Sequence, residues 1–197
     1  MKKTVAISVL MAAILLMSAG WSLSESTAQF TFMDAITWDS TPEDVASILG
    51  EGVQRADGND ESTGTITILR KDNSDFVGFK CSIMAFAYNN NLFSIACYYT
   101  EANVASPDAL IEGLTEIYGA PKKYASNIVS LEDLMCETKA LGKWTIGHDT
   151  AIEAMQLYAE SCIWPKREEA PYSYIVSFKN IPVEKQMEEA ILKVYGN

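Results

Sequence analysis

The chain has 197 residues, with 15 basic and 26 acidic side chains, which gives a formal net charge of −11. An acidic excess of this size repels phosphate backbones, so we expect no nucleic-acid partner. Hydrophobic residues make up 48% of the sequence, which is enough to bury a core, and the length fits one compact domain or two small ones.

The first 28 residues have the pattern of a secretory signal peptide. Lys2 and Lys3 precede an uncharged, mostly apolar run over residues 4–20, and small residues follow. If the leader were retained, it would be a membrane anchor near the lower length limit for spanning a bilayer. We therefore expect a secreted or cell-envelope protein whose membrane contact is only through an uncleaved leader. The residues that fit the end of a cleaved leader are Gly20, Ser24 and Ala28.

A helix is predicted over residues 42–49, with start and stop residues typical of those positions. Thr41 is a good N-cap, Pro42 suits the first helical position, and Gly50 can adopt the left-handed conformation that ends a helix. Residues 106–119 repeat this plan, beginning with Ser-Pro-Asp and ending on a glycine. The predicted buried stripes consist of Val45, Ile48 and Leu49 in the first helix and Leu110, Ile111, Leu114, Ile117 and Tyr118 in the second.

Residues 64–100 have the pattern of a three-stranded meander, in which RKDNSD is the first connector. In the second and third strands the apolar residues fall on odd positions. A three-residue loop over 89–91 would pair Tyr88 with Leu92 and bring these odd positions onto one face. The residues on that face are Phe79, Cys81, Ile83, Ala85, Phe93, Ile95, Cys97 and Tyr99.

An even number of cysteines in an exported chain permits two disulfides. In the register above, Cys81 and Cys97 are diagonal neighbours, so either a bridge after a loop shift or two buried thiols would fit. The spacing contains no CxxC, which argues against metal binding and thioredoxin-like chemistry. No cysteine lies near the leader, which excludes a lipid-anchored cysteine at the mature terminus. The four cysteines are Cys81, Cys97, Cys136 and Cys162.

The second half repeats the order of helix and strands. We expect a short helix over 130–141, a hairpin over 143–164 that turns at 147–149, a polar loop over 165–171 and a strand over 172–178. A C-terminal helix follows. Its predicted apolar stripe consists of Met187, Ala190, Ile191, Val194 and Tyr195.

Each capped helix therefore precedes strands with one apolar face. The sequence predicts an α+β fold of two helix-plus-antiparallel-meander modules in tandem, stacked or sharing one sheet. After the leader (1–28), the first module would span 29–104 and the second, with the C-terminal helix, 105–197.

No pattern singles out a catalytic centre. His148 is the only histidine, and Cys162 lies too far along the strand to pair with it, which leaves Cys136 as the open alternative for a Cys–His pair. The acidic run 57–64 fails the EF-hand pattern, because Ser62 and Ile68 stand where glycine and glutamate are required. Nothing marks the carboxylate pairs as buried or facing a cleft. These pairs include Glu132–Asp133 and Glu168–Glu169. We expect no catalytic residue, no metal site and no cofactor.

A partner surface is predicted around the polar loop, which carries basic residues in an otherwise acidic protein. Aromatic rings beside it would offer a large contact area with few rotatable bonds. The residues of this predicted surface are Trp164, Lys166, Arg167 and Tyr172.

The run STPEDVASILGEG resembles the T-x-x-x-V-x-x-x-L-G-x-P signature of small exported SmpA/OmlA-type (BamE-like) modules, through Thr41, Val45, Leu49 and Gly50, with Gly52 in place of the proline. The ending IYGAP at 117–121 is similar to the G-x-P that closes this signature. A related arrangement occurs in tandem in secreted β-lactamase inhibitor proteins. The resemblance implies an α+β scaffold and a function in binding, and it carries over no functional residue.

The function expected from these patterns is that of an exported, non-catalytic binding protein whose partner is another protein or a cell-envelope component. Two alternatives stay open: an inhibitor of a secreted hydrolase, and a secreted enzyme that uses carboxylates or a cysteine.

Overall fold

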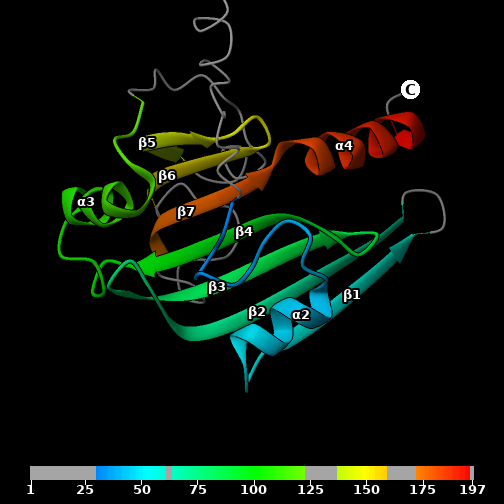
Figure 1. The fold of residues 1–197 in the computed structure, drawn as a ribbon, viewed down its shortest axis with the longest axis horizontal. Helices are drawn as coiled ribbons and strands as arrows, with labels where there is room; N and C mark the ends of the chain where they lie inside the picture. The colour runs from blue at the N-terminus through cyan, green and yellow to red at the C-terminus, as the bar shows by residue number, and fades with distance from the viewer. Residues whose placement is uncertain (1–29, 61–63, 123–136, 159–171, 196–197) are drawn as a thin grey trace, which may run out of the picture.

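The computed structural model describes residues 30–60, 64–122, 137–158 and 172–195 (Figure 1). Within these ranges the chain forms three helices and seven strands, so the α+β class is confirmed. The elements in chain order are α2 (Pro42–Leu49), β1 (Gln54–Asp60), β2 (Gly64–Phe76), β3 (Phe79–Tyr88), β4 (Asn91–Thr100), α3 (Pro107–Tyr118), β5 (Glu137–Ile146), β6 (Thr150–Tyr158), β7 (Tyr172–Asn180) and α4 (Ile181–Tyr195).

All seven strands belong to one antiparallel sheet with the order β1-β2-β3-β4-β7-β6-β5. The sheet consists of two meanders, β1–β4 and β5–β7, which meet where β4 pairs with β7. Cys97 lies opposite Val176 at this junction. The two halves of the chain therefore share one sheet and are not two separately stacked layers.

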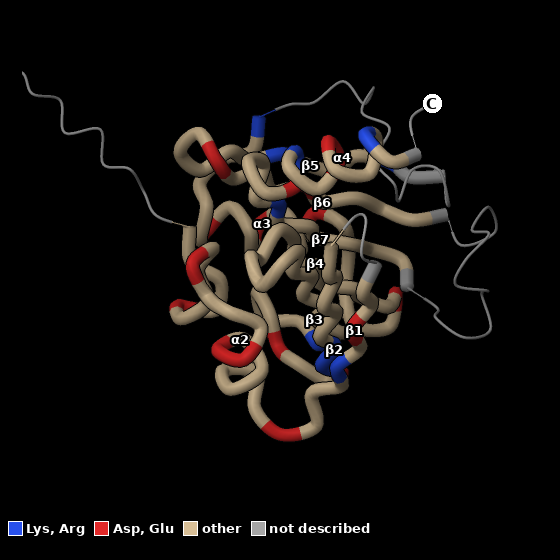
Figure 2. The backbone as a smooth tube through the Cα atoms, turned by 90° about the vertical axis from the view of Figure 1, so that its right-hand side faces the viewer, with Lys and Arg blue, Asp and Glu red and all other residues tan. Residues whose placement is uncertain are grey.

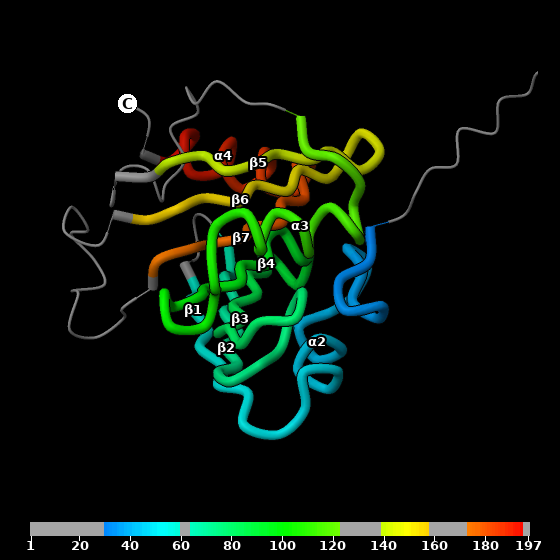
Figure 3. The backbone as a smooth tube through the Cα atoms, turned by 90° about the vertical axis from the view of Figure 1, so that its left-hand side faces the viewer, coloured from blue at the N-terminus to red at the C-terminus, as the bar shows by residue number. Residues whose placement is uncertain are grey.

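One face of the sheet, called here the first face, carries the main core. Figure 3 shows α2 and residues 30–40 on the same side of the strands. Val45 of α2 and Leu110 and Leu114 of α3 are fully buried in one cluster with side chains of the sheet. A group of rings lies in this cluster, with Phe32 and Phe178 at a centroid distance of 5.2 Å. This burial is the main contribution of the helices to stability.

Both predicted helix starts are confirmed. Thr41 and Asp44 form a capping box at α2, and Ser106 Oγ accepts a hydrogen bond from the backbone N–H of Ala109 at 3.2 Å. Gly50 and Gly119 follow the two helices with φ of +77° and +78°.

The predicted apolar stripes of the two helices are only partly buried. Ile48 is 42% exposed and Ile117 is 57% exposed, contrary to the prediction. The cause is the small area of contact: α2 packs chiefly against β2 and α3 chiefly against β5, so the sheet reaches only one side of each helix.

The first meander contains a strand that the sequence pattern did not indicate. Residues 54–60 (QRADGND) are polar, yet they pair with β2 along their whole length. Strand β2 also continues through the predicted connector RKDNSD, and the turn falls at Val77 and Gly78 instead. A short polar strand suits the edge of a sheet, because it discourages pairing with another chain.

The β3–β4 loop is shorter than predicted. Asn89 and Asn90 form a two-residue turn with φ of +48° and +66°, so Tyr88 pairs with Asn91. An irregularity after Leu92 then restores the predicted register, in which Ile83 lies opposite Cys97. Leu92 is buried as a result. Phe93, which the sequence pattern predicts on the buried face, is instead partly exposed beside Phe86, with ring centroids 6.1 Å apart.

In the second meander, residues 137–141 lie in β5 and not in the predicted helix. Their pairing with β6 decides this conformation. The predicted turn at 147–149 is confirmed. The remainder of the predicted helix (130–136) and the polar loop 165–171 lie outside the described residues.

Helix α4 follows β7 directly and contacts β4 and β7. Of its predicted stripe, Met187 is buried, whereas Ile191 and Val194 are exposed, because the sheet covers only one part of the helix. In the part of the chain that the structure describes, no helix has both the length and the apolar character that crossing a membrane requires.

Candidate functional site

The second face of the sheet, opposite α2, carries a row of large apolar and aromatic side chains on β2, β3 and β4. Side chains alternate between the two faces of a strand, so the even positions of β2 and β3 point away from the main core. Every member of the row is partly exposed. This set, named the aromatic face, consists of Ile66, Ile68, Met84, Phe86, Tyr88, Phe93 and Tyr98.

The pairing of the strands makes the aromatic face continuous. Ile68 lies opposite Phe86, and Ile66 lies opposite Tyr88. The ring of Phe93 lies beside that of Phe86. Cross-strand neighbours of this kind have side chains in contact, so the rings and branched chains form one surface.

Towards the second meander, the aromatic face joins a small buried cluster. Ala96, Met155 and Ile175 form this cluster, and Phe86 and Tyr98 of the aromatic face pack against it. The apolar part of the second face therefore crosses the β4–β7 junction and includes both halves of the chain.

Charged side chains border the apolar surface at one end. Arg70 Nε lies 3.0 Å from Asp72 Oδ1, and the Ser82 hydroxyl donates a hydrogen bond to the same oxygen over 2.6 Å. The Ser82 hydrogen bond, with a smaller contribution from Arg70, lowers the pKa of Asp72. This carboxylate is therefore ionised at neutral pH. A hollow of about 270 Å³ lies here, between Lys80 and Tyr98, and Figure 2 shows basic positions gathered near β2.

A second charged group lies on β5, β6 and β7. Glu153 is 2.6 Å from Lys143 Nζ and 3.5 Å from Lys179 Nζ, and the three side chains are largely buried. Removing one of these three side chains would leave an uncompensated buried charge, so the group is expected to be kept together next to the apolar surface.

The side chains of the predicted partner surface fall outside the described part of the chain. Trp164, Lys166 and Arg167 lie outside the described residues. Tyr172 begins β7, but its side chain lies outside the described part.

The structure places two of the four cysteines. Cys81 and Cys97 are buried free thiols on the first face, and no bridge joins them. Burial raises the pKa of the Cys97 thiol, and the neighbouring Cys81 acts in the same direction. Such a thiol is a poor nucleophile. Cys136 and Cys162 lie outside the described residues.

The other residues weighed for chemistry are dispersed. His148 is exposed in the β5–β6 turn. Asp57 lies on the edge strand β1, where it accepts hydrogen bonds from Arg55 and Thr67. The pairs Glu132–Asp133 and Glu168–Glu169 lie outside the described residues. Among the residues described, no three histidine, cysteine or acidic side chains are grouped as a metal site would require.

Sequence reasoning missed the aromatic face, although a signal for it was present. Strand β3 carries Met84, Phe86 and Tyr88 on its even positions, while its odd positions already supply the core. An antiparallel strand with one solvated face normally alternates apolar and polar residues. Apolar residues on both faces therefore indicate a second contact surface.

Comparison of the chain with protein-family models, with curated proteins and with solved structures finds no match in any of the three.

Proposed function

We propose that this protein is an exported, non-catalytic binding protein that holds another protein on its aromatic face. One observation carries the proposal: Phe86, Tyr88, Phe93 and Tyr98 remain partly exposed together on the sheet face opposite α2. Clustered aromatic side chains dominate the energetics of protein interfaces, because rings bury a large area and lose few rotamers.

A protein partner fits this surface better than a small molecule. The face extends over three strands and continues to the β4–β7 junction, whereas small ligands bind in concave pockets. Arg70 and Asp72 supply charges of both signs at its border. An apolar centre with a polar border is the usual anatomy of an interface between proteins. The expected partner therefore carries an apolar patch of its own, bordered by charges that complement these two.

The location and the tandem plan belong to the same proposal. The leader over residues 1–28 supports export, so the partner is expected outside the cytoplasm. The order of a capped helix followed by a meander occurs twice, as α2 with β1–β4 and as α3 with β5–β7. This order supports an origin as two tandem modules, as in the secreted families that the sequence resembles. Joining two modules edge to edge gives one face wide enough for a protein.

Position-specific cross-linking tests the proposal. A photoreactive residue replaces Phe93 in the protein without its leader, and in a matched control it replaces Ile48, which is an exposed apolar residue on α2. Each protein is exposed to the culture medium and the envelope fraction of its own cells. We expect one partner to be cross-linked from position 93 and not from position 48.

Substitution then tests whether the contact stabilises the complex. Phe93→Ser with Tyr88→Ser should weaken binding of that partner by about 2 kcal/mol or more, whereas Ile48→Ser should leave it unchanged. Denaturant unfolding of each variant shows that the fold is kept. Equal cross-linking from both positions, or undiminished binding by the double variant, would overturn the proposal.

A further inference from the structure

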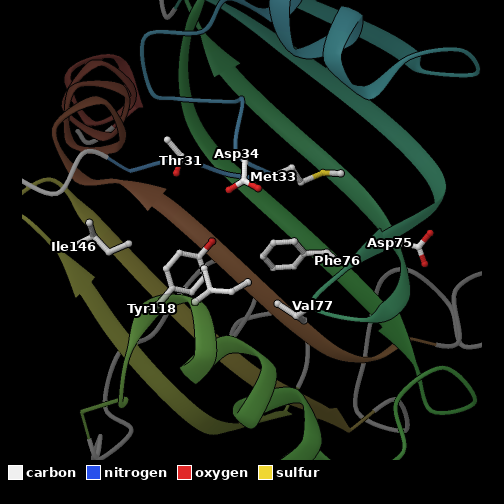
Figure 4. Close-up of a pocket in the computed structure, with 9 residues that line it drawn as sticks. Thr31, Met33, Asp34, Asp75, Phe76, Val77, Tyr118 and Ile146 are labelled. Atoms are coloured by element: carbon white, nitrogen blue, oxygen red, sulfur yellow. The ribbon is translucent and has the colours of Figure 1, made fainter.

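A cavity of about 570 Å³ opens on the first face, on the other side of the sheet from the aromatic face (Figure 4). Its walls come from the segment before α2, the β2–β3 turn, the end of α3 and the end of β5. This volume lies within the range of small-molecule sites, roughly 300–1,000 Å³. The cavity therefore differs from the aromatic face in the size of ligand that it can hold.

Apolar side chains that are not part of the buried core surround the opening of the cavity. Met33 is 41% exposed and Ile117 is 57% exposed, and both line the cavity. Phe76, Tyr118 and Ile146 extend the apolar wall inwards. Large apolar side chains left in water around a concavity favour a ligand with an apolar body.

The polar groups of the cavity are acidic or neutral. Figure 4 shows the Asp34 carboxylate and the Tyr118 hydroxyl coming from opposite walls and directed towards one another. In the described part of the chain the structure records no hydrogen bond or ion pair for the Asp34 carboxylate. The other carboxylate, Asp75, is already paired with Lys80 Nζ at 2.5 Å. No basic side chain lines the cavity among the residues described.

The unpaired carboxylate also acts on its neighbour. Burial is the main cause that raises the pKa of Tyr118, and the negative charge of Asp34 acts in the same direction. The hydroxyl therefore stays protonated, and its oxygen can accept a hydrogen bond from a ligand.

The walls are held in costly backbone conformations. Met33, Asp34 and Val77 have φ of +52°, +58° and +48°. A β-branched residue such as Val77 rarely adopts a positive φ, so contacts with the surrounding structure must stabilise this conformation. Gly113 of α3 leaves room for the Val77 side chain, because a Cβ at position 113 would lie only 3.2 Å from Val77 Cβ. The cavity is thus preformed by the packing of the turn on the helix.

We propose that this cavity binds an organic ammonium ion with an apolar body. The ammonium group pairs with the Asp34 carboxylate and donates a hydrogen bond to the Tyr118 hydroxyl oxygen. The hydrocarbon part lies against Phe76 and Ile146, and the rings of Phe76 and Tyr118 add cation–π attraction. An anion of the same shape is excluded, because both charged residues of the lining are acidic.

Three probes with one apolar body test the proposal by calorimetric titration of the leaderless protein. They are 4-phenylbutylamine, 4-phenylbutanol and 4-phenylbutyrate, which differ only in the charge of the head group. We expect the amine to bind about tenfold more tightly than the alcohol, and the carboxylate not to bind.

Two matched variants test whether the Asp34 carboxylate recognises the ammonium group. Asp34→Asn keeps the size of the side chain, and asparagine tolerates a positive φ, so the fold is kept. It should reduce the affinity for the amine to that for the alcohol. Asp39→Asn, which removes an exposed carboxylate that does not line the cavity, should leave both affinities unchanged. Ile117→Ser should weaken amine and alcohol alike, because it removes part of the shared apolar wall.

The following results would contradict the proposal. Equal binding of amine and alcohol, or equal effects of Asp34→Asn and Asp39→Asn, would show that Asp34 does not recognise the charge. Absence of binding by all three probes to the folded protein would show that the cavity is not a ligand site. The aromatic face is on the other side of the sheet, so neither result bears on the proposed protein partner.

Discussion

Trp38 donates a hydrogen bond from its indole Nε1 to Thr150 Oγ1 over 2.6 Å, and this bond joins the segment before α2 to the first residue of β6. The indole ring also stacks on Phe30 with a centroid distance of 4.2 Å. Two segments 112 residues apart in the sequence are thereby tied together across the first face.

Thr150→Val removes the acceptor of this bond while keeping the shape of a buried side chain. Because the indole N–H is then left without its partner, we expect the free energy of unfolding to fall by about 1–2 kcal/mol. Denaturant unfolding measures the change. Thr145→Val, at an exposed position of β5, is the control and should change stability by less than about 0.5 kcal/mol.

Gly142→Ala tests a close approach within β5. A Cβ at this position would lie 2.8 Å from Cη2 of Trp144, which is buried and donates a hydrogen bond to the Gly119 carbonyl over 2.7 Å. The indole would have to move and strain that bond, so we expect destabilisation by about 1–3 kcal/mol. Trp144 fluorescence should shift in the same variant. A stability equal to the wild type would contradict the packing described here.

Tyr99→Phe tests a buried hydroxyl. Tyr99 is fully buried, and within the described part of the chain its hydroxyl has no hydrogen-bond partner. Removal of an unsatisfied polar atom is neutral or favourable, so we expect an unchanged or higher free energy of unfolding, by up to about 1 kcal/mol. Thermal unfolding provides the measurement. A loss of stability would mean that the hydroxyl does have a partner.

Asp44 links the stability of α2 to pH. Its carboxylate accepts hydrogen bonds from the backbone N–H of Thr41 at 2.9 Å and from the Thr41 hydroxyl at 2.7 Å. These two bonds lower the pKa of Asp44 below its ordinary value of 3.8, and the bond from the backbone N–H has the larger effect. A lowered pKa in the folded state stabilises the protein above the unfolded pKa, and this contribution disappears as the pH falls through the folded pKa.

Asp44→Asn should therefore lower the denaturant midpoint at neutral pH and make no difference to it below the folded pKa. Unfolding curves at about pH 7 and at successively lower pH compare the two proteins, and their difference should shrink as the pH falls below the ordinary value of 3.8. Asp39→Asn, at an exposed position outside the helix, is the control. A difference between Asp44→Asn and wild type that stays constant over this pH series would show that the cap does not depend on the carboxylate charge.

Thiol labelling checks the state of the buried cysteines. Cys97 is fully buried and burial raises its pKa, so iodoacetamide should not modify it in the folded protein. After unfolding without a reductant, both Cys81 and Cys97 should be labelled, because both are free. Peptide mass mapping distinguishes this result from a Cys81–Cys97 disulfide, in which neither would react before reduction.

Local chemistry in the sequence was sufficient for the helix starts and stops. Thr41, Asp44 and Gly50 act within one turn of the backbone, so their hydrogen bonds depend on few other residues. The turn at 147–149 and the alternation that buries Cys81, Ile83 and Ala85 are local in the same sense.

Pairing between distant segments determined the rest. Residues 54–60 have no apolar pattern, and they form a strand only because β2 offers its edge. Residues 137–141 have a helix-like sequence, and they are extended because β6 lies beside them. Both conformations depend on backbone hydrogen bonds to another strand, and the local sequence does not indicate which strand will lie beside it.

The candidate sites depend on tertiary structure in the same way. The sequence showed aromatic residues on β3 and β4, but the placing of α2 and α3 on the first face decided which rings stay exposed. Asp34 and Tyr118 meet at one cavity only because α3 packs on the β2–β3 turn beside the first described segment. By itself the sequence determined the capped helices, the hairpin turn at 147–149 and the buried alternation, since these depend on neighbouring residues. Which surfaces are left open depends on how all the elements pack, so only the tertiary structure could decide it.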